Sequence, residues 1–147
     1  MNKAKAIPEG YHTVTPYLVV DKAAELIDFM QRAFGAQVRL KMVNQDGSIG
    51  HSELRIGDSM LMLGGARDQW KAMPTTIYLY VEDCDAVYAK ALEAGAESIM
   101  PLQDQFYGDR SGGVKDVSGN LWWIATHKQD LSEEELHRRA AAARGAH

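Results

Sequence analysis

Apolar residues along the chain follow two different periods. Residues 16–20 (PYLVV) and 77–81 (IYLYV) are short runs of β-branched and aromatic residues, which are typical of strands. After each run, apolar residues recur at intervals of three and four, which is typical of an amphipathic helix. The recurring positions are Ala23, Leu26, Ile27, Met30 and Phe34 in the first stretch, and Cys84, Val87, Tyr88 and Ala91 in the second. The pattern therefore predicts a strand followed by a helix at two places.

Both predicted helices have residues typical of helix ends. Asp21 precedes the first helix and Glu82-Asp83 precedes the second, and such acids cap helix N-termini. Gly35 and Gly95 stand where a helix C-cap requires a left-handed residue. The inner face of the second helix carries Cys84, which we therefore expect in the core.

Further strand signals follow each helix. The first is followed by runs at 37–44, 49–56 and 59–63, separated by Asp-Gly and Gly-Asp turns. The second is followed by 98–102, a long loop at 103–113, a strand near Val114 and a last strand at 121–125. Each half thus reads β-α-β-β-β, and the halves agree better in element order than in residue identity.

The whole chain, residues 1–147, is predicted to form a single α+β domain. Module 1 spans about 12–64, a linker 65–74, module 2 about 75–127, and a helical tail 131–147. In the tail, Ser132 and Glu135 have the spacing of a capping box, with Leu131 and Leu136 as the hydrophobic staple.

Composition narrows the class of partner and compartment. The formal net charge is −4, from 20 acidic and 16 basic residues, which argues against nucleic acid because phosphate binding needs a basic face. No apolar run is long enough to cross a membrane, and the basic N-terminus has no apolar signal core. The single cysteine fits a reducing compartment. We expect a cytoplasmic protein.

The paired modules, the opening YLVVDKAAELIDFMQRAFGAQV (17–38) and the close VKDVSGNLWWIAT (114–126) resemble the vicinal oxygen chelate superfamily. Within it, the chain is most similar to the glyoxalase and bleomycin-resistance group. The resemblance implies two curled half-barrel sheets with the helices on their outer faces and a ligand groove between the concave faces. It also implies a homodimer, with the modules closing within one chain or across two.

Metal-using members of the superfamily carry His, Glu or Gln ligands on the first and last strand of each module. Carried over by position, those ligands fall on Thr15, Met62, Thr76 and Trp123. None is a good ligand for a divalent ion that prefers imidazole or carboxylate. We therefore predict no metal and no cofactor.

Strand parity assigns the two adjacent tryptophans to opposite faces, because successive side chains alternate across a sheet. The more apolar face belongs against the helices, so Trp122 is expected in the core and Trp123 in the groove. The same rule places Val38, Leu40 and Met42 on the helix side, and Arg39 and Lys41 on the groove side. The predicted ligand-binding residues are Thr15, Tyr17, His51, Met62, Thr76, Tyr78, Tyr80, Tyr107, Arg110 and Trp123.

The segment HSELR is the main candidate for catalysis. His51, Glu53 and Arg55 alternate onto one face, about 7 Å apart for each second residue. A histidine beside a carboxylate is how a general base is oriented. The alternatives are a solvated or ion-paired strand face and a metal site built on His51 and Glu53. His12 and His127, near strand ends, are expected at the surface.

Two connecting segments are also candidates for contacts. The loop 104–113 (DQFYGDRSGG) is either a ligand-contacting lid or a surface excursion. The segment 64–74 is interpreted as the linker between modules, with Trp70 available to cap a groove or a dimer contact.

Three functions are compatible with these patterns. The one favoured by the missing ligand set is a protein that binds a small aromatic or cationic molecule, as bleomycin-resistance proteins do. The alternative is an enzyme of the same superfamily, a lyase, isomerase or dioxygenase, that is metal-free with His51 as base or has a shifted metal site. A protein- or RNA-interaction module on an open sheet is opposed by the negative charge.

Overall fold

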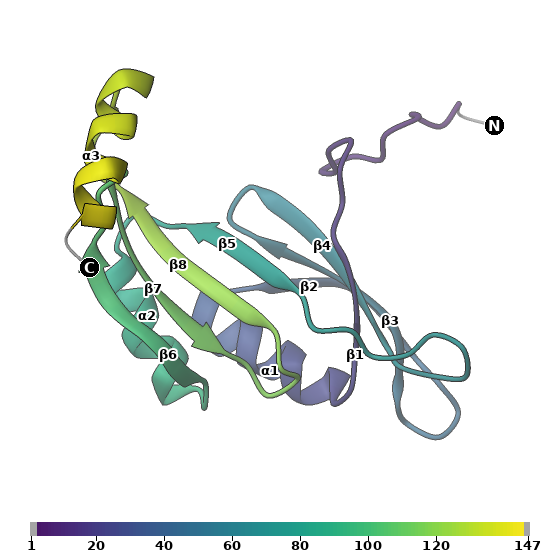
Figure 1. Ribbon diagram of the computed structural model, residues 1–147. Helices are drawn as coiled ribbons and strands as arrows, with labels where there is room; N and C mark the ends of the chain where they lie inside the picture. Colours follow the sequence, from purple (N-terminus) through teal and green to yellow (C-terminus); the bar gives the residue numbers. More distant parts are fainter. Residues whose placement is uncertain (1–2, 146–147) are drawn as a thin grey trace.

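The computed structural model describes residues 3–145, and it consists of two four-stranded mixed sheets and three helices (Figure 1). The elements are β1 (Tyr17–Val20), α1 (Ala23–Phe34), β2 (Gln37–Val43), β3 (Ile49–Ile56), β4 (Ser59–Gly65), β5 (Thr76–Tyr80), α2 (Cys84–Glu93), β6 (Glu97–Asp104), β7 (Asp109–Lys115), β8 (Leu121–His127) and α3 (Glu133–Gly145). Within residues 3–145, no helix has the length and apolar character needed to span a membrane.

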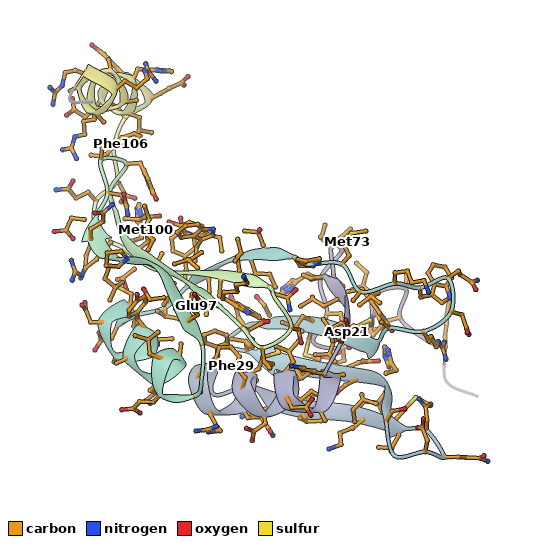
Figure 2. All side chains as sticks on the ribbon, turned by 60° about the horizontal axis from the view of Figure 1, so that its bottom comes forward. Asp21, Phe29, Met73, Glu97, Met100 and Phe106 are labelled. Carbon is orange, nitrogen blue, oxygen red and sulfur yellow. The ribbon has the colours of Figure 1, made fainter. Side chains whose placement is uncertain are left out.

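The two sheets repeat one topology, as predicted. Their strand orders are β1-β4-β3-β2 and β5-β8-β7-β6. In each sheet the first strand runs parallel to the last and the other pairs are antiparallel. Helices α1 and α2 lie side by side on one side of the sheets (Figures 1 and 2). The fold is therefore α+β with tandem β-α-β-β-β modules, and the sheets do not close into a barrel.

Trp122 lies at the centre of the core, where the modules meet. Its side chain is completely buried, and its ring centroid lies 4.7 Å from that of Phe34 on α1. Its Nε1 donates to the buried carboxylate of Asp116 at 2.7 Å, so the one polar atom of the indole is satisfied. Trp123 is only partly buried, and Cys84 is buried on α2. The predictions for Trp122 and Cys84 are confirmed.

The helix ends match the sequence only in part. Asp83 caps α2 by accepting from the Ala86 N–H at 3.2 Å, and Gly35 ends α1 with φ of 67°. At α1, however, the N-cap is Lys22 in the left-handed region with no side-chain cap hydrogen bond, so the prediction for Asp21 was wrong. The C-cap of α2 is Ala94, and Gly95 follows it with φ of 106°.

A β-bulge overturns the predicted parity of β2. Val38 pairs with the buried Leu54 and so lies on the helix side as expected, but the register shifts before Leu40, which pairs with Glu53, and Met42 pairs with His51. Because cross-strand partners share a face, Leu40 and Met42 lie with Glu53 and His51, and both are exposed. An extra residue in a bulge reverses every side chain beyond it, and alternation alone does not reveal it.

The predicted long loop at 103–113 is mostly a hairpin. β6 extends to Asp104, β7 begins at Asp109, and a short turn joins them. Gly112 and Gly113 lie inside β7. A Cβ atom at Gly112 would come within 2.9 Å of the Tyr88 ring, and one at Gly113 within 2.6 Å of the Trp123 ring. These glycines permit close packing within a strand, although in the sequence they had indicated a loop.

Helix α3 is attached at its beginning and projects beyond the end of the second sheet (Figure 1). Ser132 Oγ accepts from the Glu135 N–H at 3.1 Å, which confirms the N-cap. The Glu135 carboxylate bonds Arg138 and Arg139 rather than returning to Ser132. Arg139 also donates to the carbonyl of Phe106, which Figure 2 shows at the end of the molecule nearest α3. No residue of α3, over the part described, is buried.

Candidate functional site

A groove of about 1210 Å³ lies between the two modules. Its walls come from the segment before β1, the end of α1 and the β3–β4 turn of module 1, and from β5 and β8 in module 2. We call it the inter-module groove, and its lining residues are His12, Val14, Pro16, Phe34, Ile56, Gly57, Asp58, Ser59, Met60, Leu61, Ile77, Tyr78, Leu79, Tyr80, Val81, Glu82, Trp122, Thr126 and His127. Residues 77–81, in and just after the edge strand β5, line the groove in succession, so side chains from both faces of the strand reach it.

The lining of the inter-module groove is mainly apolar and carries an acidic bias. Asp58 and Glu82 are its carboxylates, and His12 and His127 are its imidazoles. Among the described residues that line it, none is Lys or Arg. The groove therefore offers a cation two carboxylates, and the only side chains among its described lining residues that can carry positive charge are the two imidazoles.

Tyr78 and Tyr80 form an aromatic rim at the groove. Their ring centroids are 5.2 Å apart, and 41% and 61% of the two residues are exposed. Both phenols donate to Oδ2 of Asp109, at 2.8 and 3.0 Å. Burial, then hydrogen bonds with Tyr107 and Asp109, raise the pKa of Tyr78, and burial and the bond to Asp109 raise the pKa of Tyr80, so the phenols remain protonated donors. The rim is thus held in place by one buried carboxylate.

Asp109 also receives a third donor, His127. Its Oδ1 lies 2.8 Å from His127 Nδ1, on the adjacent strand. Burial by itself would raise the pKa of Asp109, but the bonds from His127, Tyr78 and Tyr80 outweigh it and leave that pKa below its ordinary value. The carboxylate is therefore ionised.

His127 lies between two carboxylates. While Nδ1 faces Asp109, Nε2 lies 2.8 Å from Asp130 at the beginning of the C-terminal segment. The hydrogen bonds to Asp109 and then Asp130 raise the pKa of His127. Each ring nitrogen thus faces a carboxylate oxygen, and His127 joins the groove, β7 and the tail. It is half exposed, as predicted, but it is tied into this network.

A second polar network lies on the exposed face of the first sheet. Tyr17 Oη is 3.1 Å from His51 Nδ1, and His51 Nε2 is 2.8 Å from Glu53 Oε2. The other Glu53 oxygen accepts from the Tyr11 hydroxyl. Tyr11 first and His51 second lower the pKa of Glu53, while burial and Glu53 raise the pKa of Tyr11 to about 12. Tyr17, His51, Glu53 and Tyr11 form one hydrogen-bonded chain, which we call the sheet-1 network.

The predicted site residues lie in three places. Tyr78 and Tyr80 line the inter-module groove. Tyr17, His51 and Met62 lie together on the first sheet, where Met62 pairs with both Tyr17 and Glu53.

The remaining predicted residues are more scattered. On the second sheet Trp123 pairs with Tyr78, and Thr76 begins β5. Thr15 precedes β1 and bonds the His12 carbonyl. Tyr107 lies in the β6–β7 turn, and Arg110 is paired with Asp85 and Asp104.

Sequence reasoning did not identify Asp109 and Tyr11 as site residues. Asp109 fell inside the predicted loop, although it pairs directly with His127 once β7 is extended to its true start. Tyr11 lies before the first strand, and only the three-dimensional path of that segment brings it to Glu53, 42 residues further along. No local pattern in the sequence marks that contact.

The residues at the superfamily's metal positions do not suit a divalent metal. Thr15, Met62, Thr76 and Trp123 offer two hydroxyls, a thioether and an indole. Residues 3–145 also contain no group of three or more His, Cys, Asp or Glu side chains placed to hold a metal ion. A metal-free protein remains a prediction, which elemental analysis of the purified chain tests.

Comparison with known proteins defines the class. The family model described as the Glyoxalase/Bleomycin resistance protein/Dioxygenase superfamily matches residues 11–124. The chain belongs to this superfamily. It is 37% identical over 134 residues to the uncharacterized protein Rv0887c of Mycobacterium tuberculosis, covering 84% of this chain and 79% of that one. The uncharacterized protein Mb0911c of Mycobacterium bovis is 37% identical, with 88% of its length covered.

Solved structures share the fold. TioX from Micromonospora sp. ML1 superposes with a TM-score of 0.65 at 24% identity, over 78% of this chain and 98% of that one. A glyoxalase-related enzyme from Fulvimarina pelagi gives 0.64 at 15% identity, over 78% and 87%. At these identities the likeness concerns the fold alone.

Proposed function

We propose that this protein binds a small aromatic or cationic molecule, of the size of an antibiotic, in the inter-module groove. The observation that carries the proposal is the composition of the groove: an exposed pair of tyrosines above apolar walls, with carboxylates and no Lys or Arg among the described lining residues. Small-molecule sites are typically concave, mostly apolar and supplied with a few polar groups.

The tyrosine rim favours a flat ring as ligand. Large aromatic side chains are costly to leave in water, yet Tyr80 is 61% exposed and is held by Asp109. A rim that is already ordered loses little conformational entropy when a ring stacks on it. Stacking would thus remove apolar surface from water without first rearranging the site.

The charges favour a cation over an anion. Tyrosine ring faces attract cations, and Asp58 and Glu82 add negative charge at the walls. The Asp109 carboxylate lies directly behind the rim, where His127 and the two phenols already bond it. A positively charged aromatic molecule would use both features.

The groove is larger than many ligand pockets, which enclose roughly 300–1,000 Å³, and at about 1210 Å³ it is open between two modules. We also propose that two chains associate into a dimer. The edge strands β1, β2, β5 and β6 each have only one paired neighbour in the part of the chain described, so each has a free edge at which a second chain can pair. Sedimentation should then give about twice the 16.3 kDa mass of the chain. A monomer at every concentration would contradict the dimer.

The experiment compares two dyes of opposite charge. Proflavine, a flat cation, should bind the protein with one saturable site, whereas the anionic 8-anilinonaphthalene-1-sulfonate should bind much more weakly. Tyr80→Ala should weaken proflavine about threefold to tenfold, since a stacked aromatic pair is worth about 0.5–1.5 kcal/mol beyond its area.

Trp70→Ala is the matched control, because Trp70 is equally exposed, at 60%, but does not line the groove. Equal binding of both dyes, or an equal loss in both variants, would overturn the proposal.

A further inference from the structure

The sheet-1 network has the connectivity of a nucleophile, a base and an orienting carboxylate. Tyr17 bonds His51 through Nδ1, and His51 bonds Glu53 through Nε2. The tautomer follows from these partners. Glu53 is ionised and can only accept, so Nε2 of His51 carries the proton and donates it to the Glu53 carboxylate. Nδ1 of His51 then presents its lone pair to the Tyr17 hydroxyl. With this tautomer the phenol donates to Nδ1 of His51, and Nε2 on the opposite side of the ring faces a carboxylate.

Glu53 is held firmly in this position. Tyr11 donates to Oε1 while His51 occupies Oε2, so both carboxylate oxygens are engaged. The Glu53 side chain is 19% exposed and that of His51 is 25% exposed, which strengthens their interaction relative to open water. Tyr17 remains 50% exposed and is the member of the chain that an incoming molecule can reach.

The backbone of β4 makes room for this arrangement. A Cβ atom at position 64 would come within 2.8 Å of Tyr17 Oη and 2.9 Å of the Gly50 carbonyl. Glycine at this position lets the phenol lie beside His51, and the two rings stack with centroids 5.6 Å apart.

The geometry points to a metal-independent acyl-transfer centre in which Tyr17 is the nucleophile, His51 the general base and Glu53 the residue that positions His51. Proton removal by a neighbouring base is how a weakly nucleophilic hydroxyl is activated. The inference is independent of ligand binding in the inter-module groove, which Tyr17, His51 and Glu53 do not line.

The substrate class follows from the surroundings. The cross-strand neighbours of His51 and Glu53 are Met42 and Leu40 on one side, and Met62 on the other pairs with Glu53 and Tyr17. Thioether and aliphatic side chains suit a neutral, apolar acyl group. We therefore assign the centre to uncharged esters.

The reaction balances within these residues and water. The Tyr17 oxygen bonds to the ester carbonyl carbon, the phenolic proton passes to His51 Nδ1, and the bond from that carbon to the leaving oxygen breaks. The leaving alcohol takes the proton from His51. Water then attacks the acyl-tyrosine, gives one proton to Tyr17 by way of His51, and releases the acid. The sum is ester and water to acid and alcohol.

The test is site-resolved acetylation of the intact chain by p-nitrophenyl acetate, stopped by acid before the acyl-tyrosine turns over and read by peptide mass. Tyr80 is an internal control, because it is more exposed than Tyr17 but donates to the ionised Asp109. Tyr17 should be acetylated on the order of tenfold or more faster than Tyr80, since general-base catalysis contributes roughly 10²–10⁴-fold. Equal rates at the two tyrosines in the unmodified protein would overturn the inference, and this comparison needs no variant.

Variants separate the roles. His51→Gln should bring Tyr17 acetylation to the rate of Tyr80, while Tyr80 itself, as a reporter of folding, keeps its own rate. Glu53→Gln should lower the maximal rate of Tyr17 acetylation at saturating ester. The ester concentration at which this rate is half-maximal should not change. Full Tyr17 acetylation in His51→Gln would exclude His51 as the base and contradict the centre.

Discussion

Trp122 and Trp123 are consecutive residues of β8, but one side chain is buried and the other is partly exposed. Trp122 is buried against Phe34 and bonds Asp116, and Trp123 lies partly exposed over Gly113. Their opposite orientation followed from sequence because alternation in β8 is uninterrupted: all seven of its pairs with β7 are in register. The expected place of Trp123 in the groove did not follow, because Trp122 and not Trp123 lines the inter-module groove.

Replacing each tryptophan in turn should show that the buried ring contributes more to the free energy of unfolding than the partly exposed one. Trp122→Ala should lower the free energy of unfolding by about 3–5 kcal/mol, the usual cost of emptying a large aromatic site in a core. It also leaves the Asp116 carboxylate without one donor. Trp123→Ala should cost clearly less, because water can reach its site. Chemical unfolding of both variants measures the difference, and a larger loss in Trp123→Ala would mean that the face assignment is reversed.

His127 should make stability depend on pH. Asp109 and Asp130 raise its folded-state pKa, so its contribution to stability is complete below the unfolded value of about 6.5 and is lost as pH rises through the folded pKa. His127→Gln should therefore be less stable than the parent below about pH 6, and the gap should narrow at alkaline pH. Denaturant titrations across this range test it. A gap that widens with pH would show that His127 is not held as an imidazolium.

At the scale of elements, regular periodicity was predictable and local irregularity was not. The strand–helix starts, the Gly35 cap and the Ser132 cap follow from residue types whose conformational preference is local. The β2 bulge and the β6–β7 hairpin do not, because each depends on a neighbouring strand. In β7, glycines that indicated a loop are required by the rings of Tyr88 and Trp123.

A side chain at position 113 should demonstrate this packing. The Cβ atom in Gly113→Ala would lie 2.6 Å from the Trp123 ring and 3.0 Å from Ile99, so one of them must move. We expect a loss of about 1–3 kcal/mol in the free energy of unfolding, the usual cost of overpacking. Gly145→Ala is the control, since nothing lies within 4 Å of its added atom. If thermal unfolding of the two variants is indistinguishable, β7 is not packed in this way.

For the whole molecule, the paired-module fold and the superfamily were accessible from sequence, because element order and turn positions recur in both halves. The candidate site was accessible only in part. Tyr78 and Tyr80 were identified by their strand, whereas Asp109, which fixes both phenols, depends on a hairpin that the pattern did not reveal. A groove between modules is set by how two units pack, and periodicity within each unit carries no information about that.

Ligand binding in the inter-module groove is tested most directly by locating bound proflavine. Backbone amide NMR shifts recorded during a proflavine titration should change most on β5 and around the β3–β4 turn, near Ile56, Leu79 and Tyr80. Residues of the sheet-1 network should change little. Shifts that instead centre on His51 and Met62, or that spread evenly over the surface, would contradict ligand binding in the inter-module groove.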